Sequence, residues 1–251
     1  MKTLFKAALF LLGISNPPLQ AASEKESIVV GMAAIYAPFE FIENGQIVGY
    51  DVDLIRAIAK EMGWQVTLVN LPFEDIIPAI KRDKINLAIS AINVTPNRKM
   101  ELDFSKYYYQ PNELVWVYPQ YGTYPHATPK KNLRVGVQQG TILETWAKED
   151  QKKHTSYKLS KFNSTPLLFA ALENNQLDSI LVEKLQAQAF CTLHPSFRYQ
   201  LTGEVIAGYA LAFKKGSLYV EEVNRILEKL QTTGFLDHLQ QKWILRSHNT
   251  E

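Results

Sequence analysis

Short apolar, β-rich runs alternate with amphipathic helical patterns along most of the chain, and this alternation constrains the fold more than any other feature. The runs with the length and composition of strands are Ile28–Met32, Val66–Val69, Leu87–Ile89, Leu133–Val137 and Ser179–Val182. Helical patterns lie between them. One begins after Asp51, repeats its apolar residues at helical spacing and stops at Gly63, a residue typical of the position just after a helix. Such alternation predicts an α/β fold with parallel sheets.

The N-terminus has the order of a secretory signal peptide. Lys2 and Lys6 flank a short apolar run over residues 7–14, and Pro17-Pro18 and small residues follow it. This run is far shorter than the roughly 20 residues that a membrane-spanning helix needs. We therefore predict a signal peptide over residues 1–21 and export to the periplasm.

Net charge and length narrow the class of protein further. Removing residues 1–21 deletes two lysines and no acid, so the formal net charge falls from +2 to 0. A nucleic-acid-binding surface is therefore not supported. The remaining length, about 230 residues, exceeds the usual size of one domain and allows two lobes or one large α/β unit. The proline-rich stretch Pro119–Lys131 predicts a surface loop and is a candidate boundary between lobes.

A strand-to-helix corner at residues 93–96 predicts an anion site. Thr95 suits the cap of the following helix, and Pro96 suits its first position. Arg98 then falls in the first turn. The N–H groups of a helix start and a guanidinium both favour an anion. Because no glycine-rich phosphate loop is present, a small carboxylate fits better than a phosphoester.

Arg98 has a second interpretation, as a surface arginine paired with Glu101 or Asp103. Its place after a strand favours the ligand site. Ser90, Asn93 and Arg98 all follow the carboxyl end of one strand, where ligands of open α/β sheets bind.

Two more strand ends carry polar residues. Residues 138–141 form a second strand-to-helix corner, in which Gly140 permits a tight turn and Thr141 can cap a helix. Glu183 follows a third strand and could pair with an ammonium. An ordinary capped turn and an ordinary helix-start acid remain the alternatives for these two corners. Tyr36 and Phe73 also follow strand ends and are candidates for the walls of a pocket.

Signatures of enzymes are scarce. No two histidines have metal-ligand spacing, no serine-nucleophile elbow is present, and no phosphate or dinucleotide loop occurs. The single cysteine, Cys191, has no activating neighbour in sequence and cannot form an internal disulfide. We predict no catalytic residue, no metal and no cofactor. The histidines are His126, His154, His194, His238 and His248.

Four segments resemble the polar amino-acid family of periplasmic solute-binding proteins, the receptors of ABC importers. They are Tyr36–Phe41, Gly49–Leu54, Ile85–Ser105 and Val135–Thr141. The resemblance implies the two-lobed α/β periplasmic-binding-protein fold, with a hinge and a ligand cleft between the lobes. It places lobe 1 at residues 27–112 plus 207–251 and lobe 2 at residues 113–206. It also implies a monomer that delivers an amino acid to a membrane permease.

The same resemblance implies roles for individual residues. Arg98 would clamp the α-carboxylate with the N–H groups of Asn93 and Ile142. The α-ammonium would go to the Ala91 carbonyl, the Asn93 side chain and Glu183. Tyr36 and Phe73 would sandwich the ligand side chain. The other residues implied to line the site or its rim are Ser90, Gln138 and Thr141.

Departures from the family pattern concern the identity of the ligand. Ala33 stands where basic-amino-acid receptors often have an aspartate, and Glu183 replaces the usual aspartate. Two aromatic walls favour arginine over lysine, ornithine, histidine and glutamine. The missing carboxylate at Ala33 disfavours it, unless Glu40 or a bridging water takes over that role. The alternative is an enzyme like cyclohexadienyl dehydratase, for which Glu183 is the acid we can place in the cleft.

Overall fold

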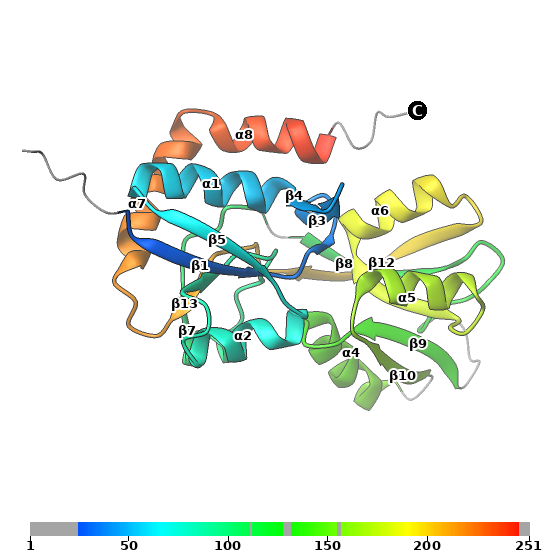
Figure 1. Cartoon of the computed structure of the whole chain (residues 1–251). Helices are drawn as coiled ribbons and strands as arrows, with labels where there is room; N and C mark the ends of the chain where they lie inside the picture. Colours follow the sequence, from blue (N-terminus) through cyan, green and yellow to red (C-terminus); the bar gives the residue numbers. More distant parts are fainter. Residues whose placement is uncertain (1–24, 111, 128–131, 155–156, 246–251) are drawn as a thin grey trace, which may run out of the picture.

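The computed structural model describes residues 25–110, 112–127, 132–154 and 157–245. The predicted signal peptide lies outside these residues. Two separate five-stranded sheets, each flanked by helices, form the two lobes of an α/β protein (Figure 1). In the described part of the chain, no helix is both long enough and apolar enough to cross a membrane.

The first sheet combines strands from both ends of the chain. In spatial order its strands are β5 (Gln65–Asn70), β1 (Ser27–Met32), β6 (Leu87–Ala88), β13 (Ala212–Lys214) and β7 (Leu102–Phe104). The helices of this lobe are α1 (Tyr50–Met62), α2 (Phe73–Lys81), α3 (Pro96–Glu101), α7 (Tyr219–Thr232) and α8 (Phe235–Leu239), followed by a π-helix over Gln240–Leu245.

Helices cover both faces of this sheet. Successive side chains of a strand point to opposite faces, so neighbouring residues pack against different helices. Val30 of β1 packs in one apolar cluster with α1, α7 and α8, whereas Val29 packs in another with α2. The core strands β1, β5 and β6 are parallel, as strand–helix alternation predicts, while β13 runs antiparallel to its two neighbours.

The second sheet is built from the middle of the chain. Its strands are, in spatial order, β10 (Tyr157–Phe162), β9 (Leu133–Gln138), β11 (Ser179–Glu183), β8 (Asn112–Pro119) and β12 (Phe197–Ile206). Trp116 of β8 belongs to an apolar cluster on one face with α4 (Ile142–Lys153), and Val117 belongs to a cluster on the other face with α5 (Thr165–Glu173) and α6 (Lys184–Leu193).

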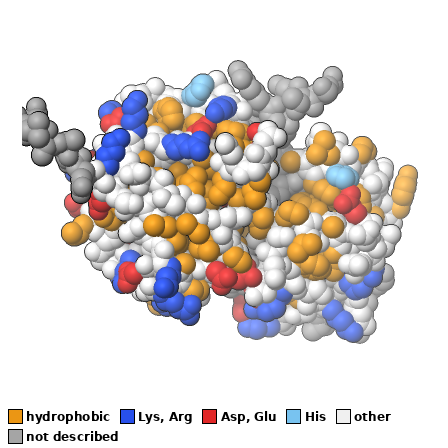
Figure 2. All heavy atoms as spheres, in the orientation of Figure 1, with side chains coloured by type: hydrophobic (Ala, Val, Ile, Leu, Met, Phe, Trp, Pro, Cys, Tyr) orange, Lys and Arg blue, Asp and Glu red, His pale blue; other side chains and the backbone are white. Residues whose placement is uncertain are grey.

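A small third sheet lies beside the junction of the lobes (Figure 1). Its antiparallel strands are β2 (Ile35–Tyr36), β3 (Glu40–Glu43) and β4 (Gln46–Val48). Figure 2 shows the two lobes meeting along a seam, with acidic side chains gathered beside it, where α2 approaches α4. The first turn of α2 carries Glu74 and Asp75.

The chain crosses between the large sheets after β7 and returns after β12. Tyr109 and Tyr209 on the two crossing segments form an antiparallel bridge, and Asn112 of β8 lies opposite Ile206 of β12. Two adjacent connections of this kind suit a hinge. The predicted lobe boundaries at residues 112/113 and 206/207 remain predictions.

Most local predictions are confirmed. All five predicted strands form, α1 ends at Gly63 in the left-handed conformation (φ 69°), and the Thr95 hydroxyl caps α3 by accepting from the Arg98 N–H. One is wrong: the stretch Pro119–Lys131 cannot separate the lobes, because it connects β8 and β9 of the same sheet.

Candidate ligand-binding site

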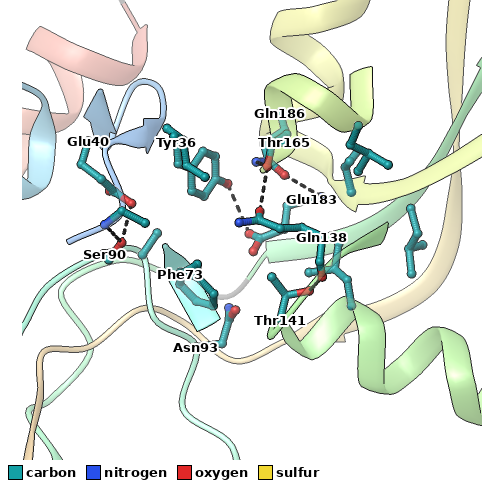
Figure 3. A pocket seen from close by; sticks show the side chains of 17 residues that line it. Tyr36, Glu40, Phe73, Ser90, Asn93, Gln138, Thr141, Thr165, Glu183 and Gln186 are labelled. Atoms are coloured by element: carbon teal, nitrogen blue, oxygen red, sulfur yellow. Dashed lines mark hydrogen bonds between the residues drawn. The ribbon is translucent and has the colours of Figure 1, made fainter. Parts of the chain in front are cut away.

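A cavity lined by both apolar and polar side chains lies between the two lobes (Figure 3). Its empty space of about 480 Å³ includes open solvent, and only about 30 Å³ of it can hold the centre of a water molecule. Eight of the ten predicted site residues line it: Tyr36, Phe73, Ser90, Ala91, Asn93, Gln138, Thr141 and Glu183. Arg98 lines a neighbouring hollow with Phe73 and Gly140, and Ile142 is the first residue of α4.

Arg98 connects the two lobes. Its guanidinium donates from Nη1 to the Asn93 carbonyl at 2.8 Å and from Nη2 to the Gly140 carbonyl at 3.0 Å. It also lies 5.6 Å from the centre of the Phe73 ring. Burial lowers the pKa of Arg98 to about 10, so the side chain stays protonated at neutral pH. A fixed positive charge therefore stands beside the cavity.

Gly140 of the second lobe lies against α2 of the first. Its φ is +77°, and a Cβ there would lie 3.0 Å from the Glu74 Cα of α2. The loop is further fixed by Glu144, which accepts from the Gly140 N–H at 2.8 Å. Only glycine combines this backbone conformation with such close contact.

We expect Gly140→Ala to weaken ligand binding by about tenfold, because the new methyl group would push the lobes apart and also strain a left-handed residue by roughly 1–2 kcal/mol. The matched control is Gly203→Ala, since Gly203 has a similar φ of +88° but nothing within 4 Å of the added Cβ. Calorimetric titration of both variants separates the two effects. Equal losses in both variants would mean that backbone strain, rather than lobe contact, is responsible.

Glu183 sits at the cavity with a dense set of hydrogen-bond donors. It ends β11, caps α6 and is only 4% exposed. Its Oε2 accepts from Asn112 Nδ2 at 2.9 Å, from the Tyr36 hydroxyl at 3.5 Å and from the Tyr209 hydroxyl. Burial raises the pKa of Glu183 to about 7, although these donors lower it. A cation bound beside it would favour its ionised form.

Glu40 and Asp51 form a buried pair of carboxyl groups at the first lobe. Glu40 lines the cavity and accepts from the Ser90 hydroxyl at 2.8 Å. Asp51 lies behind it and accepts from the Ala91 N–H at 2.9 Å and the Tyr108 hydroxyl at 2.8 Å. Among the described residues, no group outside this pair donates to Glu40 Oε2 or Asp51 Oδ1.

One shared proton explains these two atoms. Burial raises the pKa of Glu40 well above its usual range and that of Asp51 to about 6, and the two carboxyls are hydrogen-bonded to each other. Asp51 receives more donors and so holds the charge, whereas Glu40 keeps the proton. The pair therefore contributes about one negative charge at the edge of the cavity.

The second lobe adds a hydrogen-bonded chain that the sequence reasoning missed. Thr165 Oγ1 donates to Gln138 Oε1 at 2.8 Å, Gln186 Nε2 donates to Thr165 Oγ1 at 3.3 Å, and Gln186 Oε1 accepts from the Glu183 N–H at 3.3 Å. Thr165 and Gln186 lie in the first turns of α5 and α6, shortly after strand ends. Thr141 and Glu183 were predicted because they are polar residues at strand ends, and the same criterion could have identified Thr165 and Gln186.

The fold and the cavity together define a class of protein, a receptor that encloses a small polar solute between two lobes. The family model described as "Bacterial extracellular solute-binding proteins, family 3" matches residues 28–246. The chain belongs to this family. Its place in the family is that of the solute-binding protein of an amino-acid ABC transporter.

Relatives named as amino-acid-binding proteins are similar over nearly their whole length. The arginine-binding extracellular protein ArtP of Bacillus subtilis is 31% identical, over 94% of this chain and 92% of the relative. A probable histidine-binding protein of Campylobacter jejuni is 30% identical, over 94% of each chain. An ancestral arginine-binding protein solved with arginine has a TM-score of 0.79 and 30% identity, and the match covers 87% of this chain and 98% of that one.

Proposed function

We propose that the chain is a receptor for a basic L-amino acid, and for arginine first. The observation that carries this proposal is the buried Glu40–Asp51 pair, which brings a negative charge to a cavity also lined by Tyr36 and Phe73. A guanidinium can stack on aromatic rings and pair with a carboxylate at the same time. ArtP, whose name records arginine binding, supports the choice.

The α-carboxylate of the ligand would bind to Arg98. Two of the five N–H donors of its guanidinium go to the Asn93 and Gly140 carbonyls, which leaves donors for a ligand. The N–H groups of Asn93 and Ile142 would complete the anion site, since Ile142 opens α4 and Thr141 caps it. A carboxylate there would reinforce the contact between the lobes.

The α-ammonium would bind to Glu183, the Asn93 side chain and the Ala91 carbonyl. Ala91 has a φ of +43°, a conformation that costs a non-glycine residue roughly 1–3 kcal/mol and is concentrated at functional sites. The Ala91 N–H donates to Asp51, and this hydrogen bond holds the strained residue against the Glu40–Asp51 pair. Tyr36 and Phe73 would flank the ligand side chain, with Ser90, Gln138 and Thr141 lining the remaining walls.

Citrulline is the sharpest probe of this proposal, because its side chain has nearly the shape of the arginine side chain but carries no charge. We expect arginine to bind at least about tenfold more tightly than citrulline, as one charge-assisted hydrogen bond contributes roughly 1.5–3 kcal/mol. Calorimetric titration with the two ligands measures the ratio. Equal affinities would contradict a cation site at Glu40.

We expect Glu40→Gln to lower the arginine affinity by about tenfold and to leave the citrulline affinity within about threefold. The amide can donate to Asp51 and accept from Ser90, so the buried hydrogen bonds persist. The protonated Glu40 would lose its proton when a guanidinium binds beside it, and the amide cannot do so. The matched control is Glu43→Gln, at an exposed residue of the same strand. An unchanged ratio of arginine to citrulline affinity in Glu40→Gln would remove Glu40 from the site.

We also propose that the chain has no enzymatic activity and acts as a monomer that passes its ligand to a membrane permease.

A dehydratase of the cyclohexadienyl type is the second candidate function, and one observation favours it. With a pKa of about 7, Glu183 can carry a proton near neutral pH, as a general acid must. Incubation of the purified protein with prephenate or arogenate distinguishes the receptor from the dehydratase, since measurable turnover would favour the enzyme.

A further inference from the structure

Two histidines and an aspartate gather in the second lobe, outside the ligand cavity. His126 lies between β8 and β9, whereas Asp150 is in the last turns of α4 and His154 caps the end of that helix. His126 Nε2 is 3.0 Å from Asp150 Oδ2, and His154 Nε2 is 4.0 Å from Asp150 Oδ1. One ligand atom from each of the three residues lies within 4.8 Å of the others.

We propose that His126, Asp150 and His154 bind a Zn²⁺ ion. Two imidazoles and one carboxylate are a ligand set typical of zinc sites that keep a fourth position for water. Around a tetrahedral zinc, with Zn–N bonds of about 2.0–2.1 Å, ligand atoms lie roughly 3.3 Å apart. The His126–Asp150 distance already satisfies this value, and a small rotation of His154 would bring in the third ligand.

The surroundings of the three residues suit a metal site. The Asp150 side chain is only 8% exposed and accepts from the Tyr157 hydroxyl at 3.0 Å, an outer hydrogen bond of the kind that orients metal-binding carboxylates. The two imidazoles, by contrast, are 36% and 51% exposed, so they can adjust and leave a position open to water. With both imidazoles neutral, as metal binding requires, the cluster carries one negative charge.

An ordinary histidine–carboxylate hydrogen bond is the competing interpretation. The same lobe contains one, between His194 Nδ1 and Glu173 Oε1 at 2.8 Å. The cluster at Asp150 differs because a second imidazole faces the same carboxylate, with the two rings 4.3 Å apart. Asp150 and His154 are one helical turn apart, which places their side chains on one face. Histidine spacing alone could not reveal this, because His126 comes from a distant loop.

The test is zinc titration of the tag-free protein in competition with a chromophoric chelator. We expect one Zn²⁺ per chain in the wild type, and a loss of affinity of about 30-fold or more in both His126→Gln and His154→Gln. His194→Gln, the matched control, should bind zinc like the wild type. Co²⁺ in place of zinc should give visible absorption bands in the wild type that both cluster variants lose.

Two outcomes would overturn the zinc site. One is zinc binding by the wild type no tighter than by the His126→Gln and His154→Gln variants, and the other is a loss in His194→Gln as large as theirs. The site is independent of the proposed receptor function, since none of the three residues lines the cavity. Arginine affinity measured with and without EDTA should therefore agree, so failure of the zinc site leaves the receptor proposal intact.

Discussion

Arg98→Ala is expected to weaken amino-acid binding by at least about 100-fold, because the truncation removes a planar pair of charge-assisted hydrogen bonds and leaves a ligand carboxylate unpaired, at a cost of roughly 3 kcal/mol or more. It also removes the contacts of the guanidinium with the Asn93 and Gly140 carbonyls, which connect the lobes. Calorimetric titration with arginine measures the loss. Wild-type affinity in this variant would exclude Arg98 from the binding site.

Two further variants sharpen this result. Arg98→Lys keeps the charge but not the fork that matches a carboxylate, so we expect it to recover less than about a tenth of the affinity. Arg198→Ala is the matched control, since Arg198 is an exposed arginine of the second lobe that stacks on Tyr118, 5.1 Å from the ring centre. Its affinity should equal that of the wild type.

Glu183→Gln is expected to raise the Kd for arginine by about 100-fold, because the ligand ammonium loses its buried counter-charge. The amide keeps the shape of the side chain and can still accept from Asn112 and Tyr209, so the fold should persist. Glu173→Gln, an acid at the surface of the same lobe, is the control. A loss of less than threefold in Glu183→Gln would assign the ammonium to another partner.

The pH dependence of binding offers an independent measure of Glu183. Burial raises the pKa of Glu183 to about 7, and an ammonium binds the ionised form, so a proton must leave when the ligand binds at lower pH. Affinity should therefore fall about tenfold from pH 8 to pH 6 in the wild type. In Glu183→Gln the change over this range should stay below about threefold, the part due to the pair containing Asp51, whose pKa is about 6.

The fold follows from local patterns to a large extent. The helix starts marked by Thr95 and Thr141, and the helix end marked by Gly63, are set by hydrogen bonds within a few residues, so the sequence predicts them directly. The long loop after Pro119 shows the limit. Its proline and glycine content predicts a loop, but whether a loop joins two lobes or two strands of one sheet depends on pairing between distant segments.

The candidate site also has a part that the sequence predicts and a part that depends on contacts between distant segments. Ser90, Asn93 and Glu183 could be placed at strand ends, where ligands of α/β sheets bind. Ser90 and Asn93 follow a strand of the first sheet and Glu183 ends a strand of the second, and all three line the cavity between the lobes. The contact of Arg98 with the Gly140 carbonyl could not be predicted, since it depends on how closely the lobes approach. The proton shared by Glu40 and Asp51 was also beyond prediction, because burial sets its energy.

The most direct test is calorimetric titration of the unliganded protein, refolded after removal of any bound solute, with the twenty L-amino acids, ornithine and citrulline. A receptor for arginine should bind arginine one-to-one with a Kd near or below about 1 μM, which corresponds to about 8 kcal/mol. Lysine, ornithine, histidine and glutamine should bind more weakly, and citrulline at least about tenfold more weakly. Binding of no amino acid, or tighter binding of citrulline than of arginine, would contradict the proposal that the chain is an arginine receptor.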